Sequence, residues 1–192
     1  MRTPRSAGRP KAISREMLEE AACELFLERG YADTSVVDIT RRAGVSRATF
    51  FNYVDSKSDL LWASVDDAIA GIAHALGYGA NDAPGGGTEA VHEVLLTAAD
   101  TLAPGVAVLA IANAEAMGVV AELVLTGAQR QARLARAIAE HLRLSGEGAL
   151  RADVLSRAYA GAFFAALEAW AKEAPGSEPF STSLRDALEV LR

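Results

Sequence analysis

A chain of 192 residues in which 51% are hydrophobic can bury a substantial core, so its composition excludes an intrinsically disordered protein. The formal net charge of −6 taken by itself argues against a nucleic-acid partner. Only 6 prolines, together with abundant Ala, Leu, Glu and Arg, favour an all-helical fold over one containing strands.

The charge is distributed unevenly along the chain. Residues 1–57 hold ten Lys or Arg and eight Asp or Glu, a net of +2, whereas residues 58–192 hold nine and seventeen, a net of −8. A basic tail at 1–12 belongs to the positive part, and such a tail either neutralises DNA phosphates and reaches a minor groove or is a solvated segment. The asymmetry is typical of a DNA-binding domain at 1–57 followed by a second domain at 58–192.

The first helix is predicted to begin at Ser14, a suitable N-cap, and to end at Arg29-Gly30. Its apolar residues recur at three- and four-residue spacing, which gives it one face to bury. These are Met17, Leu18, Ala21, Ala22, Leu25 and Phe26. Cys23 lies within the same pattern and is interpreted as a small core residue.

Residues 35–53 read as a helix-turn-helix. Ser35 and Asp38 form an [ST]-x-x-[DE] capping pair at the first helix start. Gly44 stands where a left-handed residue ends that helix, and Ser46 is a natural N-cap for the next one. This geometry places the second helix in a DNA major groove.

The run A-G-V-S-R-A-T-F-F-N-Y-V-D-S-K-S-D-L-L, Ala43 to Leu61, resembles the DNA-binding signature of the tetracycline-repressor (TetR) family of bacterial transcriptional regulators. The resemblance extends from Ile13 to about Trp62. It implies an all-α protein of about nine helices, with an N-terminal three-helix DNA-binding domain and a C-terminal helical domain for effector binding and dimerisation.

The resemblance also implies which residues meet DNA. It places Ser46, Arg47, Thr49, Asn52 and Tyr53 at the DNA face, and Thr34 and Lys57 at flanking phosphates. Arg47 has the chemistry to bind guanine O6 and N7, and Asn52 suits a base edge or a phosphate. Phe50 is expected in the core. Phe51 stands where the family commonly has a phosphate-binding tyrosine, so it either presses on a sugar or thymine methyl or is buried.

Further helices are expected over 57–76, 88–103, 106–112, 113–144, 149–173 and 184–191. Ser56 and Asp59 form a second capping pair at the first of these. The glycine-rich link at 77–87 is predicted to be a flexible loop, because it lacks the spacing of a phosphate-binding motif. The 113–144 region is expected to be weak at Thr126-Gly127 and to expose Arg130, Arg133 and Arg136 on a solvated face.

The resemblance implies a repressor that binds DNA as a homodimer, and two-fold symmetry then predicts a palindromic operator. Release by a small, largely apolar effector is expected in addition. The resemblance implies that the last two helices pair with those of a second subunit, and small residues along 149–173 suit a close approach. The candidate effector-binding residues could equally be ordinary core or surface positions. They are Leu96, Asn113, Met117, Tyr159 and Phe163, with His74 and His92 as polar anchors.

Two other classes of protein compete with this interpretation. The first is an effector-independent or architectural DNA-binding protein, expected to have a second domain with no internal cavity. The second is a helical enzyme, which the three dispersed histidines and the absence of any nucleophile or metal motif disfavour. We therefore expect no catalytic residue, no metal and no cofactor. Without an apolar run of about 18 residues or a signal peptide, a cytoplasmic location and no membrane partner are expected.

Overall fold

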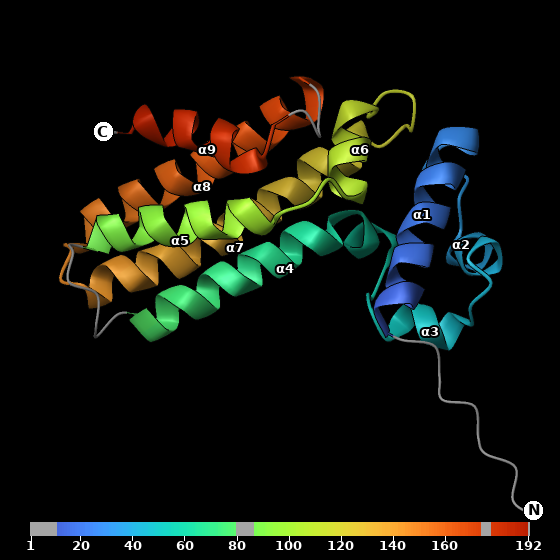
Figure 1. The fold of residues 1–192 in the computed structure, drawn as a ribbon, viewed down its shortest axis with the longest axis horizontal. Helices are drawn as coiled ribbons and strands as arrows, with labels where there is room; N and C mark the ends of the chain where they lie inside the picture. Colours follow the sequence, from blue (N-terminus) through green and yellow to red (C-terminus); the bar gives the residue numbers. More distant parts are fainter. Residues whose placement is uncertain (1–10, 80–86, 174–177, 192) are drawn as a thin grey trace, which may run out of the picture.

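The computed structural model describes residues 11–79, 87–173 and 178–191 of the chain. These residues form nine helices and no strand ladder, which confirms the all-α prediction (Figure 1). The helices are α1 (Lys11–Arg29), α2 (Val36–Arg42), α3 (Arg47–Phe51), α4 (Lys57–Gly79), α5 (Gly87–Thr101), α6 (Val106–Ala112), α7 (Val120–Leu144), α8 (Ala149–Glu173) and α9 (Phe180–Glu189).

Helices α1 to α3 gather at one end of the molecule around a small apolar core (Figure 1). Leu18, Leu25 and Phe26 of α1 are fully buried, as are Ile39 of α2 and Phe50 of α3. A core of this size stabilises a domain only marginally, so the three helices depend on the start of α4, which packs against α1. The boundary at residue 57 stays a prediction.

Helix α4 leads from this end into an elongated bundle with α5, α7, α8 and α9 (Figure 1). The two 25-residue helices α7 and α8 pack along each other, and α9 covers α8 and α5. Phe163 of α8 meets Phe180 of α9 edge to face with ring centroids 5.2 Å apart. The short α6 links the bundle to α1.

Several predicted bounds differ from those observed. Helix α1 begins at Lys11, three residues before the predicted cap, and α9 begins at Phe180, four before its predicted start. Helix α7 begins only at Val120, because Gly118 adopts a left-handed φ of 63° just before it. The basic tail at 1–10 and most of the glycine-rich loop lie outside the described residues.

The expected weak point at Thr126-Gly127 is wrong, because α7 runs through it unbroken. Thr126 Oγ1 donates to the carbonyl of Glu122 at 2.6 Å and accepts the indole N–H of Trp62 at 2.8 Å. A Cβ at Gly127 would lie 3.4 Å from the Trp62 ring. Glycine therefore serves close helix packing against α4 at this position.

Among the described residues, no single helix is long and apolar enough to cross a membrane. Only α5 and α6 taken together reach that length and hydrophobicity, and they meet at an angle of 88°.

Candidate nucleic-acid interface

Local hydrogen bonds fix the start of α2, the turn between α2 and α3, and the start of α3. Ser35 and Asp38 form the predicted capping box: the Asp38 amide donates to Ser35 Oγ at 3.2 Å, and the Ser35 amide donates to the Asp38 carboxylate at 3.1 Å. Gly44 has a φ of 66°, as predicted for the residue that ends α2. Ser46 caps α3 by accepting the Thr49 amide at 3.0 Å. The two helices are thus set as a helix-turn-helix.

Helix α3 turns one face into the core and leaves the other to solvent. Phe50 is fully buried beneath it, as expected. Ser46, Arg47 and Asn52 are exposed, and Thr49 is half-buried. Phe51 is 47% exposed, which excludes burial and leaves its ring available for a sugar or a thymine methyl. Four of the predicted DNA-binding side chains therefore share one accessible surface with Thr49 at its edge.

Arg47 is the cation that this surface offers to a ligand. It forms no hydrogen bond or ion pair with another of the described residues. Arg42 on α2 differs, because its guanidinium binds Glu24 at 2.7 Å and Glu28 at 2.7 Å on α1. The Arg42 guanidinium also lowers the pKa of the Glu28 carboxyl. Arg42 therefore fastens α2 to α1, while Arg47 stays available on α3.

Thr34 is buried and its polar groups are bonded within the chain, so its phosphate contact stays a prediction that this geometry does not favour. Its side chain is 1% exposed, and Oγ1 donates to the carbonyl of Gly30 at 2.8 Å. The Thr34 amide is also used, in a 3.3 Å bond to the carbonyl of Tyr31. Both polar groups of Thr34 hold the link between α1 and α2 in place.

Lys57 also has an internal role. Its Nζ donates to the carbonyls of Tyr31 at 2.6 Å and Thr34 at 2.9 Å, and lies 4.0 Å from the centroid of the Tyr31 ring. Burial lowers the pKa of the Lys57 amine. The predicted phosphate contact is therefore secondary to a clamp that joins the start of α4 to the α1–α2 link.

An ion-pair cluster centred on the buried Arg130 joins α4 to α7, next to the helix-turn-helix. Arg130 is 6% exposed, and its guanidinium binds both carboxylate oxygens of Asp66 and, at 3.1 Å, the carboxylate of Asp59. Asp59 also accepts the hydroxyl of Ser56, the residue before α4, at 2.7 Å. Arg130 of α7 therefore binds a carboxylate that takes part in capping the start of α4. The expected solvated arginine face is thus wrong at Arg130. That residue lies four and eight positions before the buried Leu134 and Ile138, a spacing that shares one helix face.

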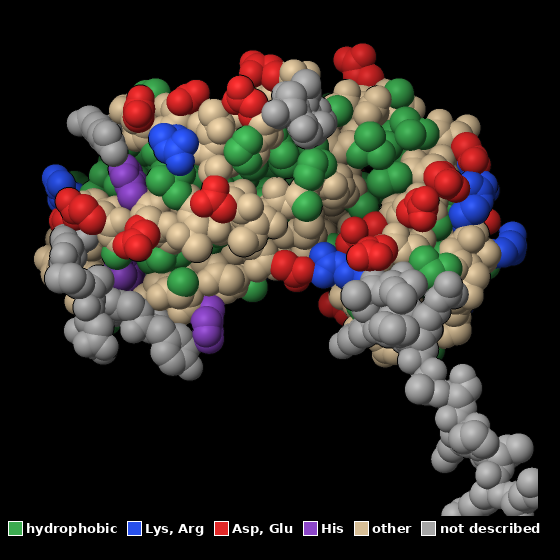
Figure 2. Space-filling view, in the orientation of Figure 1, with side chains coloured by type: hydrophobic (Ala, Val, Ile, Leu, Met, Phe, Trp, Pro, Cys, Tyr) green, Lys and Arg blue, Asp and Glu red, His purple; other side chains and the backbone are tan. Residues whose placement is uncertain are grey.

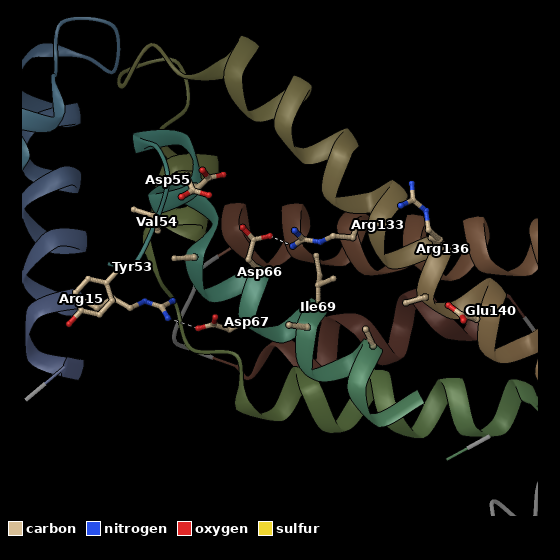
Figure 3. A pocket seen from close by; sticks show the side chains of 15 residues that line it. Arg15, Tyr53, Val54, Asp55, Asp66, Asp67, Ile69, Arg133, Arg136 and Glu140 are labelled. Atoms are coloured by element: carbon tan, nitrogen blue, oxygen red, sulfur yellow. Dashed lines mark hydrogen bonds and ion pairs between the residues drawn. The ribbon is translucent and has the colours of Figure 1, made fainter. Parts of the chain in front are cut away.

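A cleft of about 630 Å³ lies at the elbow between the helix-turn-helix end and the bundle (Figure 3). Tyr53, another predicted DNA-binding residue, lines this cleft. Arg15 of α1 reaches Asp67 of α4 across it at 2.5 Å, and Arg133 of α7 reaches Asp66 (Figure 3). Of these two ion pairs, Arg15–Asp67 joins the helix-turn-helix end to the bundle, and Arg133–Asp66 joins two helices of the bundle.

The predicted effector-binding residues do not form one cavity. Met117 is fully buried, and its carbonyl accepts the Tyr31 amide at 2.7 Å, which places it beside the helix-turn-helix end. Asn113 ends α6 and donates to the carbonyl of Leu109 at 2.9 Å. Tyr159 meets His92 edge to face at 5.2 Å, and Phe163 is a fully buried core residue. Leu96 is half-buried on α5, and His74 is exposed on α4. None of these residues lines the elbow cleft, the surface groove between α4 and α5, or the surface groove beside Trp62 and Phe164.

Within the part of the chain that the structure describes, no three His, Cys, Asp or Glu side chains gather closely enough to hold a metal ion. Cys23 is half-buried, and burial raises the pKa of its thiol to about 11. A thiol with so high a pKa is a poor nucleophile at neutral pH.

Comparison with known proteins finds the same N-terminal signature. Residues 18–63, from α1 to the second turn of α4, match the family described as "Bacterial regulatory proteins, tetR family". The mycofactocin biosynthesis transcriptional regulator MftR of Mycobacterium tuberculosis is 36% identical over 63 residues, which cover 33% of this chain and 32% of MftR. The HTH-type transcriptional regulator EthR of Mycolicibacterium smegmatis is 38% identical over 71 residues, covering 35% and 33%. The chain thus matches about a third of the length of these curated relatives.

A solved structure extends the similarity to the whole fold. FadR of Thermus thermophilus, described as a TetR-family transcriptional repressor in complex with lauroyl-CoA, matches with 25% sequence identity and a TM-score of 0.53, covering 92% of each chain. The signature at 18–63, the helix-turn-helix geometry and this fold agree. Residues 18–63 thus belong to the TetR family of bacterial regulatory proteins, and the fold of the chain as a whole is similar to that of a TetR-family repressor.

Proposed function

We propose that the chain is a transcriptional repressor that binds an inverted-repeat DNA operator as a homodimer and responds to a small, largely apolar effector. The observation that carries the proposal is the exposed face of α3, where Ser46, Arg47, Phe51 and Asn52 project from a helix whose other side is fixed by the buried Phe50. The relatives are named as transcriptional regulators, and the FadR structure is of a repressor with a bound acyl-CoA. The role requires no catalytic step, and a DNA target implies work in the cytoplasm.

Selection of bound fragments from random double-stranded DNA tests the proposal directly. The expected product is a palindrome with two half-sites about one helical turn apart, or a multiple of a turn, since a two-fold dimer presents two copies of α3. Affinity for that product is expected to fall steeply with salt, because phosphate contacts release counterions. Recovery of random sequences alone would contradict sequence-specific binding.

Replacing Arg47 by Ala is expected to cost about 1–3 kcal/mol of operator affinity per half-site if the guanidinium binds a guanine edge. The loss should be confined to operators that keep one particular base pair, which fluorescence anisotropy on single-base operator variants measures. Arg185→Ala is the matched control, since Arg185 is exposed on α9 at the other side of the bundle. Equal weakening on every sequence would make Arg47 a phosphate contact, and unchanged affinity would remove it from the interface.

For the homodimer we propose the outward face of α8. Among the small residues along α8, Ala162 and Ala166 are buried within the subunit, whereas Gly161, Ala165 and Ala169 remain accessible. Leu150 and Val154 continue this face and are 79% and 59% exposed. Helix α9 offers less than the resemblance implies, because its apolar side is already buried against α5 and α8.

The charges of this face are self-complementary. Arg157 and Glu168 are both exposed, and the midpoint between them falls between Gly161 and Ala165. Two antiparallel copies of α8 that cross at these small residues therefore place Arg157 near Glu168 of the partner subunit, twice about the two-fold axis. This arrangement supports a second copy of the chain as the occupant of the face.

A regulator without an effector is the second candidate, and one observation favours it. The interior of the bundle is filled by apolar side chains, and the elbow cleft and the other pockets of the described residues are open to the surface. Operator binding measured across a broad panel of hydrophobic compounds separates the two candidates, since the effector-independent regulator should respond to none of them.

A further inference from the structure

A groove of about 590 Å³ lies between α4 and α5, on the other side of the Arg15–Asp67 ion pair from the elbow cleft. On α4 its floor is made by Ala68, Gly71 and Ala75, and on α5 by Val94 and Ala98. From Ser64 to Ala75 the groove follows α4 for about three turns, or about 16 Å. It is therefore long, narrow and mostly apolar.

The groove exists because the outward faces of both helices carry small side chains. A Cβ built on Gly71 would meet no atom within 4 Å, so the centre of the floor is open space. The same applies to Gly77, which lies on α4 but outside the groove. Glycine within a helix costs about 1 kcal/mol relative to alanine. Neither glycine is needed for packing within the described chain.

The charges at the groove favour a cation. Asp67 and Glu93 line it as carboxylates and Arg15 as the single base, which leaves an excess of negative charge. Arg15 is already held by Glu19 at 2.8 Å and by Asp67. Glu93, in contrast, forms no ion pair with a described residue, and Thr97 lies one turn after it on the same helix. The surrounding residues 58–192 carry a net charge of −8, and acidic side chains outnumber basic ones on the bundle face drawn in Figure 2.

We propose that this groove binds an elongated aliphatic cation, with an ammonium group at Glu93 and Thr97 and an alkyl chain over Ala68, Gly71 and Ala75 toward Asp67. The inference names the effector class and site, and so rests on the proposed function. It also explains how occupancy would reach DNA. Helix α4 begins at the helix-turn-helix and α5 does not, so a ligand wedged between them acts on the Arg15–Asp67 pair that ties α1 to α4 (Figure 3).

Isothermal titration of the full chain with dodecylamine, below its micelle concentration at pH 7, tests the site. One saturable site per protomer is expected, with dodecanoate binding about tenfold more weakly. Gly71→Leu fills the floor of the groove and is expected to lower the affinity for dodecylamine about tenfold or more. Gly77→Leu makes the same change on the same helix outside the groove and should bind like the wild type. Glu93→Gln should lower the affinity for dodecylamine about fivefold and abolish the preference for dodecylamine over dodecanoate.

Two results would overturn the assignment: equal binding by the Gly71→Leu and Gly77→Leu variants, or dodecanoate binding as tightly as dodecylamine. Both glycine variants are expected to melt no lower than the wild type, so loss of folding does not confound the comparison. Operator binding by the ligand-free proteins is measured separately. If the chain binds dodecylamine but selects no DNA sequence, the groove assignment stands and the proposed function is refuted. If the chain selects a DNA sequence but does not bind dodecylamine, the proposed function stands and the groove assignment is refuted.

Discussion

Replacing Asp66 by Ala is expected to lower the free energy of unfolding by about 3 kcal/mol, measured as a shift of the urea midpoint without change in slope. Arg130 is buried, and Asp66 supplies the carboxylate that binds its Nε at 3.0 Å and an Nη at 2.8 Å. The variant leaves that guanidinium with Asp59 and the carbonyl of Thr126, and with the Trp62 ring 5.4 Å away. A buried charge that loses its main partner is costly because water cannot replace it.

The neighbouring Asp67 provides the matched control. It also pairs with an arginine, Arg15, but its side chain is 68% exposed. An exposed pair contributes about 0–1 kcal/mol, so Asp67→Ala should leave the urea midpoint nearly unchanged. Combining Asp66→Leu with Arg130→Met removes the buried guanidinium together with its half-buried carboxylate partner, and should recover most of the stability lost by Asp66→Ala. If Asp66→Ala and Asp67→Ala behaved alike, the Asp66–Arg130 pair would not be the tie between α4 and α7.

The local signals in the sequence predicted the helix-turn-helix well. The capping pair Ser35–Asp38, the left-handed Gly44 and the cap Ser46 are interactions within four residues, so spacing alone reports them. The exposed face of α3 follows from the burial of Phe50. What remains untested is whether that face binds DNA.

The failures of sequence reasoning lie where distant segments meet. Gly127 looks like a helix breaker until Trp62, from another helix, is placed against it. The resemblance places Thr34 and Lys57 at DNA phosphates, and the sequence does not show that their side chains also bind carbonyls of the α1–α2 link. The effector residues were predicted from apolar and polar types without knowing which faces were already packed, and Met117 and Phe163 proved to be core. The burial of Arg130, in contrast, could have been predicted from the sequence, because Arg130 lies four residues before the apolar Leu134 on the same helix face.

Replacing Gly161 by Glu is expected to convert the proposed dimer to a monomer and to weaken operator binding about 100-fold or more, because the second half-site is no longer bound by a linked subunit. A Cβ at Gly161 would meet only the amide nitrogen of Gln131, at 3.7 Å, so the variant subunit should fold. In the dimer, however, the two introduced side chains would meet close to the two-fold axis, where their like charges and their size prevent the close approach of the two α8 helices. Sedimentation velocity and anisotropy on full operators and half-sites measure both effects.

Charge reversal makes the test specific to the α8 face. Arg157→Glu alone should weaken the dimer, since it sets two acidic side chains opposite each other across the two-fold axis. Adding Glu168→Arg to the same chain restores opposite charges in exchanged positions, and should therefore restore both the dimer and tight operator binding. Gly77→Glu adds the same charge on α4, away from α8, and is expected to leave the assembly intact. A dimer that persists in Gly161→Glu, or that the double reversal fails to rescue, would place the interface on another face and require a different spacing of the two α3 helices on DNA.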